Sequence, residues 1–194
     1  MALPLPPAAR SAIGPPEAEV PARDAELLGT VRRRAARHAG ARAGSVYRHR
    51  PRAFLLLRES VRTLQASRAV FQRAVAILDR YCAAIGRKNL RGHWRLIDVV
   101  AAIAVKICDT PDRFEFNLDR IQRNDLTRLV KQEMRVLAAI DFEPWGDPTP
   151  VEWFLAAYGR VPDTVELDHM EGSMSASAEW SAEAAATAAF ELGR

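Results

Sequence analysis

The sequence has few of the residues that build disulfides and metal centres. Its 194 residues include two cysteines, Cys82 and Cys108, and each lies in an apolar stretch. No CxxC pair occurs, and no histidine is spaced to complete a metal site with either thiol. We therefore expect two small core residues in a reducing compartment, with no metal and no other cofactor.

Long apolar segments are also absent from the sequence. No apolar run approaches the roughly 20 residues that a membrane helix needs. The N-terminus lacks the charged start and apolar middle of a secretory signal. The expectation is a nuclear or cytoplasmic protein that has no membrane partner.

Motifs for catalysis are missing as well. No glycine-rich phosphate loop occurs, and no set of nucleophile, base and orienting residue can be proposed from spacing. The four histidines, which fall mostly in expected tails or loops, are His38, His49, His93 and His169. We therefore expect no enzyme and no small-molecule substrate.

Composition divides the chain into three parts. Residues 1–45 are rich in proline and alanine and then in arginine, which predicts a disordered arm. Residues 161–194 are acidic and rich in alanine, which predicts a flexible tail with one weak helix near residues 181–192. A hydrophobic content of 48% over this length supports one core, which we place in residues 46–160.

A basic run lies in the N-terminal arm. Its arginines are Arg32, Arg33, Arg34, Arg37 and Arg42. The simplest interpretation is a solvated arm with a short helix before Gly40. Nuclear import, organelle targeting and an electrostatic contact with a partner are the alternatives, and the acidic residues nearby argue against organelle targeting.

The middle of the chain has a helical repeat throughout, and no segment alternates as a half-buried strand does. Helices are predicted over 52–64, from Ser67 as N-cap to residue 84, over 96–107, and from about residue 124 to 140. Thr149 and Glu152 form a capping-box motif that opens another helix. The 96–107 helix is apolar on nearly all sides, so the predicted fold is an all-α bundle around it.

Two charges lie in unexpected places in these helices. Glu133 falls in the middle of an apolar stripe, one turn from Leu129 and from Leu137. Lys106 closes the most apolar helix of the chain. Because an unpaired buried charge costs several kcal/mol, each group either pairs inside the fold or faces a partner.

Asp79 is a third charge on an otherwise apolar helix. Its natural use is structural, since an arginine on the preceding helix can clamp it with two parallel hydrogen bonds. Arg52 is the preferred arginine for this salt bridge.

Several motifs in their order resemble the cyclin box. They are Arg52-Ala53-Phe54-Leu55, then residues 74–81, Ala104-Val105-Lys106, residues 133–142, Pro148-Thr149-Pro150 and Phe154-Leu155. The match spans about residues 52–159, and Leu78-Asp79-Arg80-Tyr81-Cys82 looks most like the P/U-type cyclins, in which a single box is usual. The resemblance implies a five-helix bundle and a regulatory subunit without catalytic residues.

The same resemblance implies a partner and a site. Lys106 and Glu133 would bind the C-helix of a cyclin-dependent protein kinase, whose glutamate must pair with the ATP-site lysine before phosphoryl transfer. The ammonium can donate to main-chain carbonyls and the carboxylate can accept from main-chain amides.

Two other functions remain open at this point. Cyclin-like folds also occur in transcription factors that grip DNA, although these usually pair two boxes and often add a zinc ribbon, so we do not expect a nucleic-acid partner. A cyclin-box protein could also occupy a kinase as a decoy without activating it.

Overall fold

The computed structural model describes residues 22–38, 49–86, 95–108, 123–176 and 180–193. Every regular element in these residues is an α-helix, which confirms the predicted all-α class. The helices are α1 (Ala22–His38), α2 (Arg50–Thr63), α3 (Arg68–Ala84), α4 (Arg95–Cys108), α6 (Arg123–Ala139), α7 (Pro150–Tyr158), α8 (Thr164–Ala176) and α9 (Ala182–Leu192). None of these described helices combines the length and apolarity needed to cross a bilayer.

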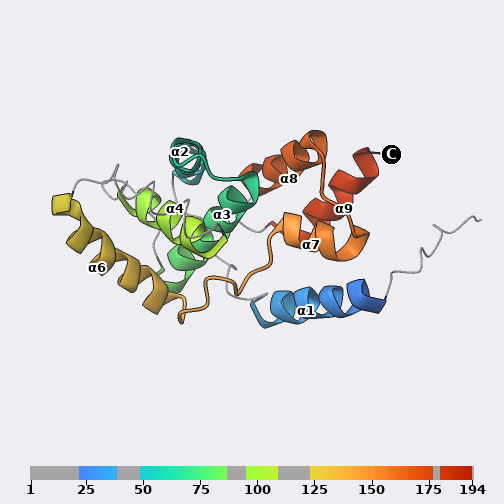
Figure 1. Cartoon of the computed structure of the whole chain (residues 1–194), viewed down its shortest axis with the longest axis horizontal. Coiled ribbons are helices and arrows are strands. Elements are labelled where there is room, and N and C mark those ends of the chain that lie inside the picture. Colours follow the sequence, from blue (N-terminus) through green and yellow to red (C-terminus); the bar gives the residue numbers. More distant parts are fainter. Residues whose placement is uncertain (1–21, 39–48, 87–94, 109–122, 177–179, 194) are drawn as a thin grey trace, which may run out of the picture.

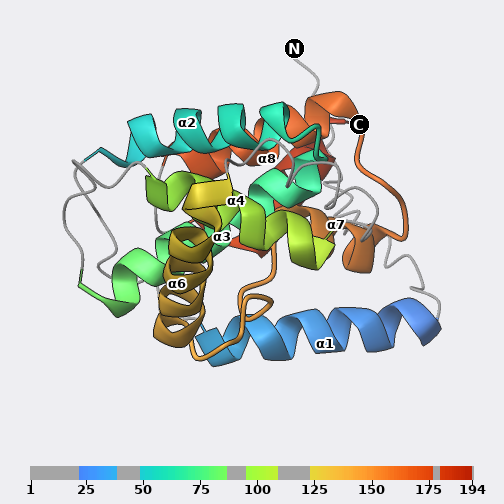
Figure 2. The same cartoon turned by 60° about the vertical axis from the view of Figure 1, so that its left-hand side comes forward.

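Helix α4 is largely buried. Nine of its fourteen residues are buried, from Leu96 to Val105. It contacts α2, α3 and α6, and Figures 1 and 2 show it lying among these three helices. An apolar sequence with three alanines explains this position, because small side chains let neighbouring helices approach closely.

Local sequence signals fix the ends of two helices as predicted. The Ser67 side chain accepts a hydrogen bond from the backbone amide of Val70 at the start of α3. At the start of α7, the Thr149 and Glu152 side chains bond each other's backbone amides in a complete capping box. These caps satisfy amides that the helices cannot pair internally.

The C-terminal segment corrects the predicted tail. Residues 164–176 and 182–192 form α8 and α9, which pack on each other, while α9 also packs on α7 (Figure 1). Met170, Met174 and Ala186 are completely buried. The acidic composition was misleading because Asp163 and Glu166 form a capping box at the start of α8: each side chain accepts a hydrogen bond from the other's amide, at 2.8 and 2.9 Å.

The N-terminal arm is also partly ordered. Residues 22–38 form α1, which packs along α7 and buries Val31 (Figure 2). The predicted short helix therefore exists, but it is not a solvated arm, because its inner side joins the core. The predicted disorder of residues 1–21 and 39–45 concerns residues outside those that the structure describes.

Candidate protein-binding site

The structure brings Lys106 and Glu133 together. Lys106 lies in the last turn of α4 and Glu133 lies in the middle of α6, which packs against α4. The Lys106 Nζ is 2.5 Å from the Glu133 Oε2, so the two groups form an ion pair. Two residues 27 positions apart thus form one charged site between two helices.

This ion pair lies at the molecular surface and not in the core. The exposed fraction of the side chain is 30% for Lys106 and 14% for Glu133. An ammonium has three hydrogen atoms to donate and a carboxylate has two accepting oxygens, so each group can bond to more than one partner at a time. The site can therefore both close the α4–α6 contact and meet main-chain groups of another protein.

Apolar side chains lie beside Glu133 on α6. Val130 and Leu137 lie three and four positions away, on the same side of the helix, and Met134 is the next residue in the sequence, about 100° further round. We call these four residues the α6 stripe. Val130 and Met134 are about half exposed, at 51% and 50%. Leu137 is partly buried against the core. Exposed apolar side chains around a partly exposed charge are typical of a protein-binding face.

Basic side chains lie on the exposed part of the same helix. Arg128, Lys131 and Arg135 are all exposed. By their spacing in the helix they lie roughly 140–160° round α6 from Glu133, on the opposite face. The positive charge of α6 therefore does not adjoin Glu133.

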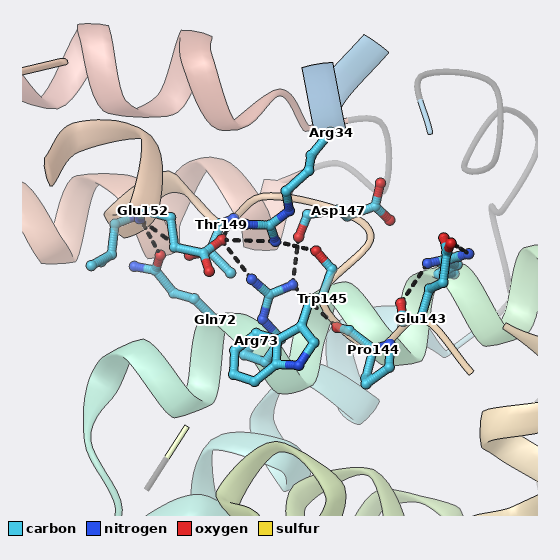
Figure 3. Close-up of polar contacts among 11 residues, drawn as sticks. Arg34, Gln72, Arg73, Glu143, Pro144, Trp145, Asp147, Thr149 and Glu152 are labelled. Carbon is cyan, nitrogen blue, oxygen red and sulfur yellow. Dashed lines mark hydrogen bonds and ion pairs between the residues drawn. The ribbon is translucent and has the colours of Figure 1, made fainter. Parts of the chain in front are cut away.

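Sequence reasoning missed an arginine cluster that holds the loop between α6 and α7, residues 140–149 (Figure 3). Arg73 on α3 is almost completely buried, and its guanidinium donates to the carbonyls of Pro144 at 3.2 Å and Asp147 at 2.5 Å. The same guanidinium bonds the Glu152 carboxylate at 2.5 Å. The main chain of this loop is therefore bound to the helix core.

Two more arginines bind this loop from other positions. Arg34 on α1 donates to the Trp145 carbonyl and lies 3.6 Å from the Glu152 carboxylate. Burial lowers the pKa of Arg34, although Glu152 opposes this shift. Arg80 on α3 donates to the Glu143 carbonyl at 2.7 Å. No sequence motif predicts hydrogen bonds to carbonyl oxygens. The only signal in the sequence was the presence of arginines on an otherwise apolar helix.

Asp79 is clamped by an arginine, but this arginine is Arg50 and not the predicted Arg52. The Arg50 guanidinium donates to both Asp79 oxygens, at 3.0 and 2.7 Å, and the Trp180 ring nitrogen adds a third bond at 3.1 Å. The reason is helical geometry. Arg50 shares the buried side of α2 with Phe54 and Leu57 at four and seven positions, whereas Arg52 is exposed.

Taken together, the fold and the site define an all-helical protein with an ion pair set in an exposed apolar helix face. Among the described residues, no three His, Cys, Asp or Glu side chains are grouped so that they could hold a metal ion. Comparisons with protein-family models, curated proteins and solved structures found no match for this chain. A functional proposal therefore depends on the motif order and on the geometry of this site.

Proposed function

We propose that this chain is a cyclin-like regulatory subunit that binds and activates a cyclin-dependent protein kinase through the kinase C-helix. The observation that carries the proposal is the ion pair between Lys106 on α4 and Glu133 in the α6 stripe, where Val130 and Met134 are half exposed. These are the two positions that the resemblance assigns to kinase binding. Their helices, α4 and α6, pack on each other, as this proposal requires.

The chemistry of the pair suits recognition of a helix by its main chain. The Lys106 ammonium would donate to carbonyls at the C-helix end, and the Glu133 carboxylate would accept from main-chain amides there. Val130, Met134 and Leu137 would bury the apolar side of the same helix. Because main-chain groups are common to all sequences, such a site accepts sequence variation in the partner.

Activation would follow from preferential binding to one kinase state. The C-helix must lie inward for its glutamate to pair with the ATP-site lysine. A subunit that binds the inward C-helix more tightly than the outward one shifts the kinase toward the active arrangement. The chain would supply no catalytic residue itself.

Co-purification with a kinase assay tests this proposal. Tagged chain is mixed with a panel of recombinant cyclin-dependent kinases, and captured kinase and peptide phosphorylation are both measured. We expect one kinase to be captured and its rate to rise at least about tenfold, equivalent to roughly 1.4 kcal/mol of preference. Capture without activation would indicate a decoy, and salt-sensitive retention on DNA without any kinase would indicate a nucleic-acid adaptor.

Alanine variants locate the interface in the same assay. Lys106→Ala and Glu133→Ala should each weaken capture by roughly 30-fold or more, as for truncation of an interfacial charge. The control is the exposed pair of Glu59 and Arg62 on α2, whose atoms lie 3.1 Å apart. Replacing either control residue with alanine should leave capture unchanged. Equal capture by all four variants would refute the interface.

A further inference from the structure

Three basic residues form a ridge along the outer side of α6, the helix at one edge of the molecule (Figure 1). Arg128, Lys131 and Arg135 recur at intervals of three and four residues, so their side chains leave the helix within about 60° of one another. All three are exposed. Val136, which is 1% exposed, marks the side of α6 that faces the core, and it lies about 80–140° round the helix from them. We call the three basic residues the basic ridge.

The cations of the basic ridge do not hold the fold together. None of them makes a hydrogen bond or an ion pair with a residue that the structure describes. Arginines elsewhere in the described chain instead bond carboxylates or main-chain carbonyls of other segments, as do Arg34, Arg50, Arg58, Arg68, Arg73 and Arg80. Three neighbouring cations without a partner therefore differ from the way in which this chain uses its other arginines.

The basic ridge also destabilises the helix that carries it. Lys131 lies three positions after Arg128 and four positions before Arg135, and like charges at these spacings repel each other. Among the described side chains of α6, no carboxylate offsets this repulsion, because Glu133 lies roughly 140–160° round the helix. The free chain thus gains no stability from the ridge, whereas an anionic partner would relieve the repulsion.

The size of the basic ridge decides which anion fits it. From Arg128 to Arg135 the helix rises roughly 10 Å, and an extended peptide covers this length with about three to four residues. A protein that binds the backbone of nucleic acid makes on the order of six to ten phosphate contacts, and basic segments that bind lipid use about four to eight basic residues. Three cations are too few for either surface, but they match a short run of acidic side chains.

We infer that the basic ridge binds a short acidic segment of a second protein, whose carboxylates pair with Arg128, Lys131 and Arg135. An arginine guanidinium can donate two parallel hydrogen bonds to one carboxylate, and the lysine ammonium can donate to another. Because the ridge lies on the opposite side of α6 from Glu133, it does not depend on the proposed kinase site, and the chain can hold two proteins at once. Exposed ion pairs are weak and are screened by salt, so the contact should be reversible and should weaken as the ionic strength rises.

Fluorescence anisotropy with the full chain tests the inference. The probe is a dye-labelled peptide with four consecutive glutamates, at an ionic strength of about 0.02 M. The ridge variant combines Arg128→Gln, Lys131→Gln and Arg135→Gln. A matched control variant removes three other exposed arginines, through Arg33→Gln, Arg37→Gln and Arg62→Gln. Each variant lowers the formal net charge of +4 by three, and glutamine keeps a good helix former at each position.

The expected result separates the two variants. The ridge variant should bind the peptide at least about tenfold more weakly than the unmodified chain, as expected for loss of three exposed ion pairs. The control variant should bind within about twofold of the unmodified chain, because its arginines are distant from the peptide. Equal losses in both variants would show attraction by net charge alone and would overturn the inference.

Two further measurements separate the basic ridge from other anion sites. Lys106→Ala should bind the peptide as the unmodified chain does, whereas a loss in this variant would place the peptide at the ion pair with Glu133 and refute the ridge. The second measurement replaces the peptide with a single-stranded oligonucleotide of the same charge, or with phosphatidylserine vesicles. Tighter binding of either probe than of the peptide, with loss of binding in the ridge variant, would assign the ridge to nucleic acid or membrane and would contradict a protein partner.

Discussion

Arginines that cross between helices hold the buried acidic and carbonyl groups of this chain. Arg50 meets Asp79, and the two side chains are 7% and 0% exposed. Arg73 meets the Glu152 carboxylate together with two loop carbonyls. The planar guanidinium suits such sites because it donates several hydrogen bonds in fixed directions and stays charged. A buried ion pair adds little net stability, but removal of one partner alone is costly because the other charge stays buried.

Asp79→Ala should destabilise the chain by about 3–5 kcal/mol, because the change leaves Arg50 buried without its carboxylate. Arg50→Ala should cost a similar amount. Arg52→Ala should cost much less, since that side chain is exposed. Chemical unfolding of the three variants measures these differences. A larger loss for Arg52→Ala than for Arg50→Ala would refute the assignment of the clamp.

Glu166 should make the free energy of unfolding depend on pH in the acidic range. The hydrogen bond from Arg160 holds the pKa of Glu166 below its ordinary value of 4.5; the amide of Asp163 lowers it further, and burial opposes both. The stabilisation is therefore complete above about pH 4.5 and is lost as the pH falls through the folded-state pKa.

Thermal melts of the unmodified chain and of Glu166→Gln measure this effect. The difference in melting temperature should be largest near neutral pH and should shrink below about pH 4.5. A difference that stays constant down to pH 3 would show that the carboxylate charge is not the cause.

At the scale of elements, helices with strong local signals were predictable, whereas α8 and the packing of α1 and α9 onto the core were not. The predicted caps at Ser67 and Thr149 are present, because a cap depends on residues three positions apart. Helices α1 and α8 instead owe their place to partners far along the chain. For example, the Glu171 carboxylate accepts from Arg68 at 2.6 Å, across 103 positions. Amino-acid composition alone does not predict which distant residues will pair.

Met174→Ala tests whether α8 belongs to the core. Met174 is completely buried, so its truncation should cost about 2–4 kcal/mol of the free energy of unfolding. Val165→Ala on the same helix is the control, because Val165 is 63% exposed and should cost within about 0.5 kcal/mol. Denaturant titration compares the two. Equal and small losses would mean that α8 is a tail after all.

At the scale of the whole molecule, part of the candidate site could be predicted and part could not. Lys106 and Glu133 were noticeable because Lys106 closes an apolar helix and Glu133 interrupts an apolar stripe, and helical periodicity reveals both. Their mutual ion pair depends on the packing of α4 against α6, which periodicity does not specify. The arginine cluster donates hydrogen bonds to main-chain carbonyls of residues 140–149. Because every residue has such a carbonyl, the sequence does not show which ones will accept.

The architecture separates the proposed binding face from the terminal helices. The α6 stripe and Lys106 lie where α4 meets α6, whereas α1, α8 and α9 pack around α7 and onto the α2–α3 side. Figure 1 shows α6 at one edge of the molecule and α9 near the other. Changes at the α6 face should therefore alter binding with little effect on the C-terminal helices.

The most direct test of the central claim is a charge exchange within the ion pair. The double variant Lys106→Glu with Glu133→Lys keeps an ion pair between α4 and α6 but reverses what each helix offers a partner. Its stability should stay within about 1 kcal/mol of the unmodified chain, as expected for a partly exposed pair. Isothermal titration with the captured kinase should show binding at least roughly 30-fold weaker. Unchanged affinity would show that the pair serves only the fold and would contradict the proposed function.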